Sequence, residues 1–231
     1  MVEPTAEITH GIDFDSTFVA SETLCDLADI ALEGDPEAEA RKAQIKVITN
    51  LAMIGQIPFH EALAKRLSLF SATQDHIDKV IERTADAIAP SVMRNADWFR
   101  KNKDGIYIIS GGFEEIITPI ACDIIGLNEG NILANSFTFD ENGVINGFDP
   151  NRHLAWAGGK VSQVSALAVE GLFIMTGDGD TDAEVKARGQ ADEFWVSEEV
   201  VRREEVVAQA DRVFPNFDGI VEAAEQLSKA T

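Results

Sequence analysis

The order of apolar and polar residues along the chain predicts an α/β protein. Short apolar runs typical of buried strands occupy residues 7–14, 105–110, 171–178, 193–196 and 211–217. Segments with helical periodicity lie between several of them, at about 113–126 and 159–169, and another ends the chain. Because strands and helices alternate, we expect a parallel sheet with helices on both faces.

Two stretches interrupt this alternation. Residues 18–89 carry helical periodicity in three or four segments, which is too long for the single crossover that joins parallel strands. We therefore expect a helical cap domain at 18–89, inserted into a core domain formed by 1–17 and 90–231. Residues 135–148 alternate apolar and polar side chains around Asn142-Gly143, which predicts a small β-hairpin.

The chain is strongly acidic, with 40 acidic and 19 basic residues and a formal net charge of −21 over 231 residues. Such a surface repels nucleic-acid phosphates and anionic lipids, so we expect neither nucleic acid nor a membrane as partner. A phosphorylated substrate is repelled too, so its site needs local cations or a metal. The chain shows no apolar run of about 18 residues and no secretion signal, and Cys25 and Cys122 suit a reducing compartment, so we expect the cytoplasm.

Polar side chains follow the first predicted strand, where Asp13 and Asp15 flank Phe14. In an open parallel sheet, ligands bind at the carboxyl ends of the strands. Alternation along an extended segment points the two carboxylates to one side and Phe14 to the other, toward the core. Paired carboxylates either share a cation or hold a proton on one member, and both states serve catalysis. The alternative is a turn or helix cap, which Asp, Ser and Thr also favour.

The sequence SGGF, residues 110–113, and Lys160 are candidates for anion binding. A hydroxyl beside two glycines, between a predicted strand and a predicted helix, offers donors that an oxyanion can approach closely. An ordinary strand-to-helix turn is the alternative. Lys160 follows Gly158-Gly159 at a predicted helix start and supplies a cation, although a lone lysine is more often a solvated surface residue.

The sequence GDGDTD, residues 177–182, follows another predicted strand and places acids at 178, 180 and 182. A calcium-binding loop of the helix–loop–helix type needs Gly at its sixth position and Glu at its twelfth. Counting from Asp178, this chain has Ala183 and Gly189 at those positions. A few hard oxygen ligands instead favour magnesium, which keeps several waters and binds through one or two carboxylates and a substrate phosphate.

Taken in order, DFDST (13–17), SGGF, GGK (158–160) and GDGDTD resemble the four motifs of the phosphoserine phosphatases of the haloacid dehalogenase superfamily. The similarity covers nearly the whole chain, including AMIGQIPFHEALAKRLSLF at 52–70. The resemblance implies a Rossmann-like core with an inserted helical-bundle cap and a small β-hairpin. It also implies hydrolysis of phosphoserine to serine and phosphate, within serine biosynthesis.

The resemblance assigns a role to each strand-end residue. Asp13 would be the nucleophile that forms an aspartyl-phosphate, and Asp15 would protonate the leaving oxygen and then activate water. Mg²⁺ would be held by the carboxylates of Asp13 and Asp178 and by the backbone carbonyl of Asp15. Asp182 would support the metal through water or steady the lysine. The residues that would bind the phosphoryl oxygens are Ser110, Gly111 and Lys160.

One cation in the predicted cap lies on an apolar helix face. On a helical wheel over 59–70, Arg66 falls within the stripe formed by Phe59, Leu63 and Phe70. Its guanidinium must reach water, pair with an internal acid or meet a bound anion. The resemblance makes Arg66 the clamp for the carboxylate of phosphoserine.

Three further residues take their roles from the resemblance. Glu22 aligns with the glutamate that binds the substrate ammonium, although the helix dipole ordinarily explains an acid near a helix start. Met53 and Phe59 match apolar residues that close over the substrate, and both would otherwise be core residues. The cap would close about hinges near 16–20 and 87–91.

The chain also departs from the family pattern. Asp180 stands where the family usually has a small neutral residue, and 197–206 stands where relatives often have a glycine-rich turn, with Arg202 on the matching arginine. Other activities stay open, namely a phosphatase or phosphotransferase acting on another small phosphorylated metabolite, or a non-enzymatic binding module. We expect a monomer or a homodimer.

Overall fold

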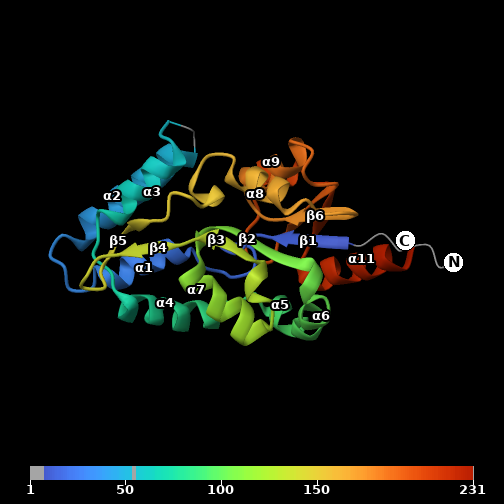
Figure 1. Ribbon diagram of the computed structural model, residues 1–231, viewed down its shortest axis with the longest axis horizontal. Coiled ribbons are helices and arrows are strands. Elements are labelled where there is room, and N and C mark those ends of the chain that lie inside the picture. The colour runs from blue at the N-terminus through green and yellow to red at the C-terminus, as the bar shows by residue number, and fades with distance from the viewer. Residues whose placement is uncertain (1–7, 54–55, 231) are drawn as a thin grey trace.

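A parallel sheet of six strands forms the centre of the protein, whose computed structural model describes residues 8–53 and 56–230 (Figure 1). The order across the sheet is β3-β2-β1-β6-β7-β8, and every pairing is parallel. The predicted α/β fold is confirmed. The strands are β1 (Ile8–Ile12), β2 (Ile106–Phe113), β3 (Ile132–Asn135), β6 (Leu172–Thr176), β7 (Glu193–Ser197) and β8 (Arg212–Phe214).

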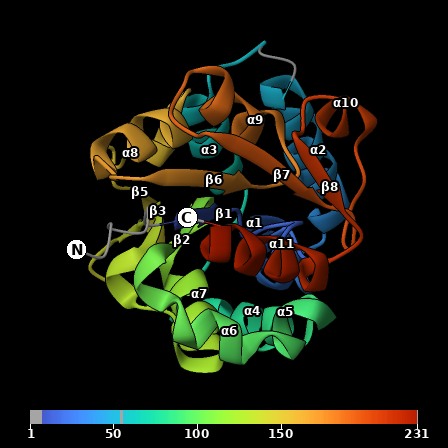
Figure 2. The same cartoon turned by 90° about the vertical axis from the view of Figure 1, so that its right-hand side faces the viewer.

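Helices cover both faces of the sheet (Figure 2). One face carries α8 (Gly159–Leu167), α9 (Asp180–Ala187) and α10 (Glu204–Val207), and the other carries α5 (Pro90–Arg94), α6 (Ala96–Lys101), α7 (Glu114–Thr118) and α11 (Phe217–Ala230). Along β6, Phe173 and Met175 pack into the first face and Ile174 into the second. The sequence of a strand that is covered on both faces is a continuous apolar run. Within the described ranges, no helix is long and apolar enough to span a membrane.

The described chain between β1 and α5 holds four helices, at the left of Figure 1. They are α1 (Thr23–Ala31), α2 (Ala38–Met53), α3 (Phe59–Leu67) and α4 (Gln74–Asp86). The antiparallel hairpin of β4 (Phe137–Phe139) and β5 (Ile145–Phe148) lies against them, since the N–H of Ile145 donates to the carbonyl of Ala72 at 2.8 Å. The predicted hairpin is confirmed. The division of the chain into cap and core domains stays a prediction.

The two connections to the inserted helices lie side by side. The N–H of Ala20 donates to the carbonyl of Ala87 at 2.7 Å, and that of Ala89 donates to the carbonyl of Phe18 at 3.0 Å. Phe14 and Phe18 are fully buried, with ring centroids 5.8 Å apart. The segment that follows β1 is therefore anchored in the core, as predicted for Phe14, and the insertion leaves and returns beside the carboxyl end of β1.

The structure corrects several predicted elements. β2 continues through Ser110–Phe113, whereas the sequence predicts that the strand ends at residue 110. The single helix predicted at about 113–126 is α7 followed by a π-helix at Pro119–Ile125, because Pro119 lacks the N–H that would continue the α-helix. The apolar pattern also misses β3, a short edge strand, and the helices α5 and α6. Short 3₁₀ helices lie at Lys103–Gly105, Glu129–Asn131 and His153–Ala155.

Candidate active site

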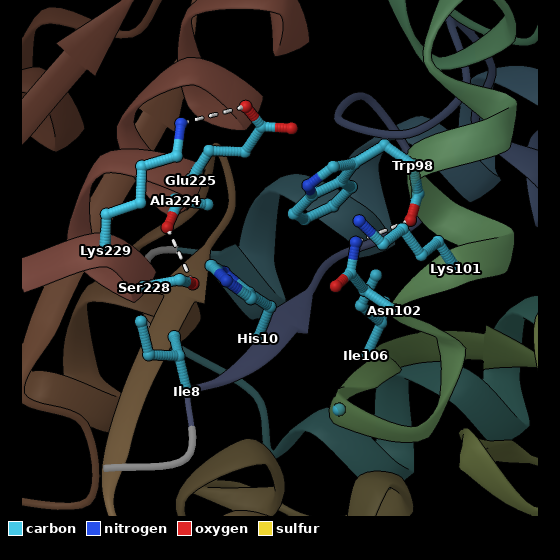
Figure 3. A pocket seen from close by; sticks show the side chains of 11 residues that line it. Ile8, His10, Trp98, Lys101, Asn102, Ile106, Ala224, Glu225, Ser228 and Lys229 are labelled. Carbon is cyan, nitrogen blue, oxygen red and sulfur yellow. Dashed lines mark hydrogen bonds and ion pairs between the residues drawn. The ribbon is translucent and has the colours of Figure 1, made fainter. Parts of the chain in front are cut away.

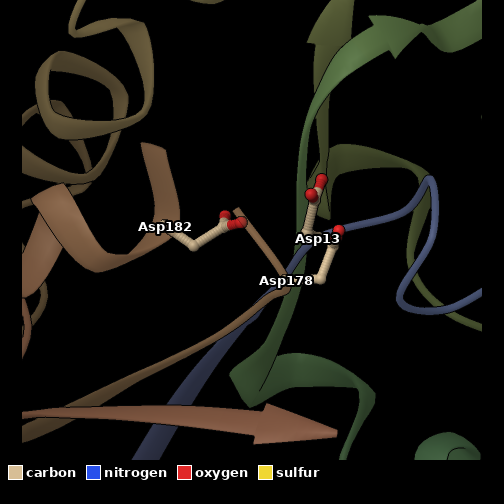
Figure 4. A group of neighbouring side chains, drawn as sticks. All are labelled: Asp13, Asp178 and Asp182. Carbon is tan, nitrogen blue, oxygen red and sulfur yellow. The ribbon is translucent and has the colours of Figure 1, made fainter. Parts of the chain in front are cut away.

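The carboxyl ends of β1 and β6 bring predicted site residues together. Ile12 pairs with Thr176, and the N–H of Asp13 donates to the carbonyl of Thr176 at 2.9 Å. Asp178 follows β6 closely, and Asp182 reaches the same space from the first turn of α9 (Figure 4). One carboxylate oxygen from each of these three acids lies within 4.8 Å of the others. Asp178 and Asp182 are buried and Asp13 is half-buried.

Lys160 enters this group from the start of α8. Its buried Nζ lies 2.9 Å from Oδ1 of Asp13 and 2.6 Å from Oδ1 of Asp182. α8 begins after Gly158, whose φ of 68° is left-handed. At Gly159, a Cβ would lie 2.4 Å from the carbonyl oxygen of His153. The two glycines therefore let the helix start close to the 3₁₀ helix before it, which brings the lysine into the site.

Asp182 is held in place by its own turn. Its Oδ2 accepts the N–H of Gly179 at 3.1 Å, while Oδ1 faces Lys160. A Cβ on Gly177 would lie 2.2 Å from Cγ of Asp182, so the approach of this carboxylate requires glycine at 177. The glycines of GDGDTD thus serve the packing of the acid that contacts the lysine.

Burial and crowded charge set the protonation of the group. Burial raises the pKa of Asp13 well above its usual range, and Lys160 opposes this rise while Asp182 and Asp178 reinforce it. Burial likewise raises the pKa of Asp182. Burial lowers the pKa of Lys160, but its two carboxylate partners outweigh burial and hold the pKa above its ordinary value. The ammonium therefore stays charged.

Asp15 faces the start of α1. Its carboxylate accepts the N–H of Thr23 at 2.9 Å and the hydroxyl of the same residue at 3.2 Å. Burial, reinforced by the charge of Glu22, raises the pKa of Asp15 to about 7. Asp13 and Asp15 thus differ in chemistry, because one contacts an ammonium and the other contacts neutral donors and can hold a proton near neutral pH.

The glycine segment at the end of β2 lies beside Asp15. The hydroxyl of the buried Ser110 accepts the N–H of Gly112 at 3.0 Å. A Cβ on Gly112 would lie 3.1 Å from Oδ2 of Asp15 and 3.2 Å from Oγ of Ser110, so these two side chains meet at that glycine. The fully buried Asn135 donates from Nδ2 to the carbonyl of Gly111 at 2.9 Å and so fixes the segment from β3. The sequence pattern gave no signal for Asn135.

Two predicted apolar residues come from the inserted helices. Phe59, at the start of α3, is half-buried, and its ring tip lies 3.4 Å from where a Cβ on Gly111 would stand. The side chain of Phe59 therefore covers the glycine segment from the side of the inserted helices. Met53 ends α2, and its side chain lies outside the described residues.

Arg66 is half-buried on α3 and has no carboxylate partner among the described residues. Its Nη2 lies 3.9 Å from Sγ of Cys25, and its buried Nε has no hydrogen-bond partner in the same part of the chain. Burial raises the pKa of Cys25, Arg66 lowers it, and Glu22 and Asp15 raise it further, so these charges surround one thiol. Glu22 is exposed and accepts the hydroxyl of Ser16 at 2.7 Å.

Asp178 has two partners that the sequence pattern does not predict. The hydroxyl of Thr17 donates to Oδ1 at 2.9 Å, and Nε of Arg203 lies 2.9 Å from Oδ2. The neighbouring Arg202, which matches the family arginine in sequence, instead contacts Glu198 and Glu204 at the surface. The identity of the site arginine depends on the path of 197–206 after β7, which no periodicity specifies.

The donors of this site suit a hard divalent cation. Asp13, Asp178 and Asp182 offer carboxylate oxygens, the ligands that Mg²⁺ and Ca²⁺ prefer. A strand precedes Asp178 and α9 begins at Asp180, so the segment is not a helix–loop–helix calcium loop. The carboxylate of Asp180 accepts a hydrogen bond from Nε2 of Gln209 at 3.0 Å.

A separate hollow of about 410 Å³ lies at the amino ends of the strands (Figure 3). His10 of β1 faces it, together with side chains of α6 and α11. Because the acids and the lysine gather at the carboxyl ends of the strands, this hollow is not part of the candidate active site.

The fold and the site define a class of protein. The first strand of the parallel sheet is followed by Asp13-Phe14-Asp15, and helices are inserted after this segment. A buried lysine and the acidic end of a second strand lie beside it. This is the arrangement of the haloacid dehalogenase superfamily. The comparisons with curated proteins narrow this class, although no family model matches the chain. The chain belongs to the phosphoserine phosphatase family.

Two curated relatives carry this assignment. The chloroplastic phosphoserine phosphatase of Arabidopsis thaliana is 34% identical over 216 residues, covering 92% of this chain and 70% of the relative. The phosphoserine phosphatase of Homo sapiens is 30% identical over 175 residues, covering 74% of each chain.

Solved structures support the same fold. A phosphoserine phosphohydrolase-like protein from Francisella tularensis superposes with a TM-score of 0.80 at 28% identity, covering 94% of this chain and 99% of that one. A substrate-bound phosphoserine phosphatase gives a TM-score of 0.73 at 20% identity, covering 96% of this chain and 99% of that one. The expected core with inserted helices and a small hairpin is confirmed as the fold.

Proposed function

We propose that the protein is a magnesium-dependent phosphoserine phosphatase, which hydrolyses O-phospho-L-serine to L-serine and phosphate. Its family membership supports this activity. We further propose that it serves serine biosynthesis and acts in the cytoplasm as a monomer or homodimer, whereas the Arabidopsis relative is named as chloroplastic.

Asp13 and Asp15 would divide the reaction between them. A carboxylate oxygen of Asp13 attacks phosphorus, the bond from phosphorus to the serine oxygen breaks, and an aspartyl-phosphate forms on Asp13. Asp15 gives its proton to the leaving serine oxygen, then takes a proton from the water that attacks phosphorus. The bond from phosphorus to the Asp13 oxygen breaks in this second step, which releases phosphate and restores the Asp13 carboxylate. The contacts of Asp15 with neutral donors and its pKa of about 7 support the proton-carrying role.

The phosphate would be held by groups that the sheet ends bring together. Ser110 and Lys160 would bind phosphoryl oxygens with the N–H of Gly111, and Asp182 would steady the lysine through their 2.6 Å contact. Mg²⁺ would be held by the carboxylates of Asp13 and Asp178 and the backbone carbonyl of Asp15, and when bound it supplies Lewis-acid stabilisation of the phosphate charge.

One observation gives the main structural support for phosphoserine as the substrate. The guanidinium of Arg66 pairs with no carboxylate in the described part of the chain. A half-buried guanidinium with an unsatisfied Nε is costly unless it meets an anion, and the carboxylate of phosphoserine suits its fork of donors. The nearby carboxylate of Glu22 would bind the substrate ammonium, and Phe59 and Met53 would cover the substrate.

A substrate panel tests this assignment. Phosphoserine is compared with phosphoethanolamine, which has the ammonium but no carboxylate, for the wild type and for Arg66→Met, with and without Mg²⁺. We expect the variant to lose roughly 10²-fold in kcat/KM for phosphoserine and little for phosphoethanolamine. Lys65→Met is the matched control, because Lys65 is an exposed cation on the same helix that pairs with Glu61. Asp13→Asn removes the proposed nucleophile and gives the background rate of hydrolysis.

The outcomes separate the candidate activities. The proposal is supported if the wild type prefers phosphoserine over phosphoethanolamine and Arg66→Met loses this preference. If phosphoethanolamine is turned over as well as phosphoserine, the carboxylate clamp is wrong and another small phosphorylated metabolite is the substrate. Activity in Asp13→Asn equal to that of the wild type would remove the nucleophile from the mechanism. Transfer of phosphate to an added alcohol in place of water would indicate a phosphotransferase.

A further inference from the structure

Arg203 contacts the candidate metal site and has no role in the proposed reaction. It lies directly before α10 and sends Nε to within 2.9 Å of Oδ2 of Asp178. That carboxylate is buried, whereas the Arg203 side chain is 36% exposed. Among the described residues, the contact with Asp178 is the one ion pair of Arg203. Its terminal Nη groups make no hydrogen bond or ion pair within those residues.

The site carries more negative than positive charge without Arg203. When ionised, the clustered carboxylates of Asp13, Asp178 and Asp182 carry three negative charges, against the one positive charge of Lys160, which contacts Asp13 and Asp182. Arg203 adds a second cation, which leaves one excess negative charge in this group. A bound divalent cation then makes the group positive by one charge. Without Arg203 the same metal-loaded group would be neutral.

A divalent cation and a phosphate dianion respond to the charge of Arg203 in opposite ways. A divalent cation is repelled by a guanidinium that lies against one of its candidate ligands, and a phosphate dianion is attracted by the same guanidinium. The surrounding chain, with its net charge of −21, supplies no compensating attraction for the anion. Each local cation therefore has a large share in phosphate binding.

We propose that Arg203 is a charge-balancing residue that weakens divalent-cation binding at Asp178 and strengthens phosphate binding at the metal-loaded site. This inference rests on the proposed function and assigns to this site an electrostatic residue beyond the four motifs. The orientation of Asp178 does not depend on Arg203 alone, because the hydroxyl of Thr17 holds the other carboxylate oxygen at 2.9 Å. Removal of the arginine therefore changes the charge of the site more than it changes the position of Asp178.

Arg202, the neighbour of Arg203 in the chain, provides a matched control. Arg203→Met and Arg202→Met each remove one positive charge, one residue apart, but Arg202 pairs with Glu198 and Glu204 at the surface. The comparison therefore cancels the change in net charge. Arg203→Gln keeps a hydrogen-bond donor for Asp178 and removes only the charge.

The affinity of each protein for Mg²⁺ alone is measured by calorimetry, and its affinity for inorganic phosphate is measured at saturating Mg²⁺. For Arg203→Met and Arg203→Gln we expect the Kd for Mg²⁺ to fall and the Kd for phosphate to rise, each by roughly fivefold or more. For Arg202→Met we expect both constants to stay at the wild-type values. Thermal unfolding of each variant checks that it is folded.

Several results would overturn the inference. Mg²⁺ affinity that is unchanged or weaker in Arg203→Met contradicts the charge argument, and so does a phosphate Kd that does not rise. Arg203→Gln behaving as wild type would assign the effect to the hydrogen bond and not to the charge. If the wild type hydrolyses phosphoserine and the Arg203 and Arg202 variants are alike, this inference alone fails. A wild type that neither binds Mg²⁺ nor hydrolyses phosphoserine would instead contradict the proposed function.

Discussion

Asp13 and Asp15 lie two positions apart, yet they meet different partners. Asp13 contacts the ammonium of Lys160 at 2.9 Å, whereas Asp15 accepts two hydrogen bonds from Thr23. The fully buried Phe14 holds the strand between them in the core. Because the local partners differ, one short segment supplies two carboxyl groups of different chemistry, which suits the separate roles that we propose for them.

The buried His10 contributes to the dependence of the protein's stability on pH. His10 is 5% exposed, and its ring centroid lies 5.7 Å from that of Trp98 and 6.0 Å from that of Trp195. Figure 3 shows His10 and Trp98 at the hollow. Lys101, Glu225 and Lys229 line the same hollow. Burial lowers the pKa of His10 from 6.5 to about 4, so the folded protein holds this ring neutral where the unfolded chain protonates it.

The stability that His10 contributes is therefore present above pH 6.5 and is lost as the pH falls from 6.5 to about 4. A pKa shift of this size corresponds to about 3 kcal/mol. We expect His10→Gln to show a shallower loss of unfolding free energy across this window than the wild type, by urea denaturation at a series of pH values. His153→Gln, at an exposed histidine, is the control. Parallel curves for the wild type and His10→Gln would contradict this assignment.

Among the elements, the start of α8 has the tightest geometric requirement. The helix begins where its backbone passes close to the 3₁₀ helix at His153–Ala155, and this contact places Lys160 between Asp13 and Asp182. The first residue of α8 is therefore both a packing position and a determinant of the site.

Gly159→Ala tests this geometry. The added Cβ would lie 2.4 Å from the carbonyl oxygen of His153 and 2.8 Å from Cα of Leu154, and both are backbone atoms that cannot move cheaply. We expect a loss of roughly 1–3 kcal/mol in unfolding free energy and a lower kcat, because α8 must shift and carry Lys160 with it. Gly130→Ala is the control, since no atom of the described chain lies within 4 Å of a Cβ there. Equal stability of the two variants would show that α8 tolerates the methyl group.

The inserted helices and the sheet are linked at two neighbouring connections. The hydrogen bonds of Ala20 with Ala87 and of Ala89 with Phe18 hold these connections together, within the predicted hinge regions at 16–20 and 87–91. Phe59 reaches from α3 toward Gly111, which places the start of α3 against the glycine segment at the end of β2. Movement about this pair of connections would therefore open and close the site, as predicted for a cap.

For the whole molecule, the net charge of −21 dominates the long-range electrostatics. Self-repulsion destabilises the compact state, and salt screens it, since the Debye length is about 10 Å at 0.1 M. Salt also weakens surface ion pairs, but each of these contributes only about 0–1 kcal/mol. Because the chain has more than twice as many acidic as basic residues, we expect the self-repulsion to outweigh these pairs in the response to salt.

We therefore expect the Tm to rise when NaCl is increased from about 0.01 M to about 0.5 M, by differential scanning calorimetry. The same comparison at about pH 5, where fewer carboxylates are ionised, is the control and should give a smaller rise. A Tm that falls with added NaCl at neutral pH would mean that specific ion pairs outweigh the self-repulsion.

Most of the fold is predictable because buried strands and long amphipathic helices leave strong patterns. The apolar run at 171–178 contains β6, and the Asn-Gly pair marks the hairpin. Short elements leave weak patterns, so β3 and α5 are missed, and the continuation of β2 through Ser110–Phe113 looks like a turn because glycine carries no strand signal.

The sequence by itself determined the chemical identity of the site: the acids, the serine, the lysine and the order in which they follow the strands. Only the tertiary structure decided their partners. It placed Arg203, and not Arg202, against Asp178, it brought Thr17 and Asn135 into the site, and it left Arg66 without a carboxylate among the described residues. The physical reason is that periodicity specifies which face of an element is buried, whereas contacts between residues far apart in the chain depend on loop paths and backbone approach.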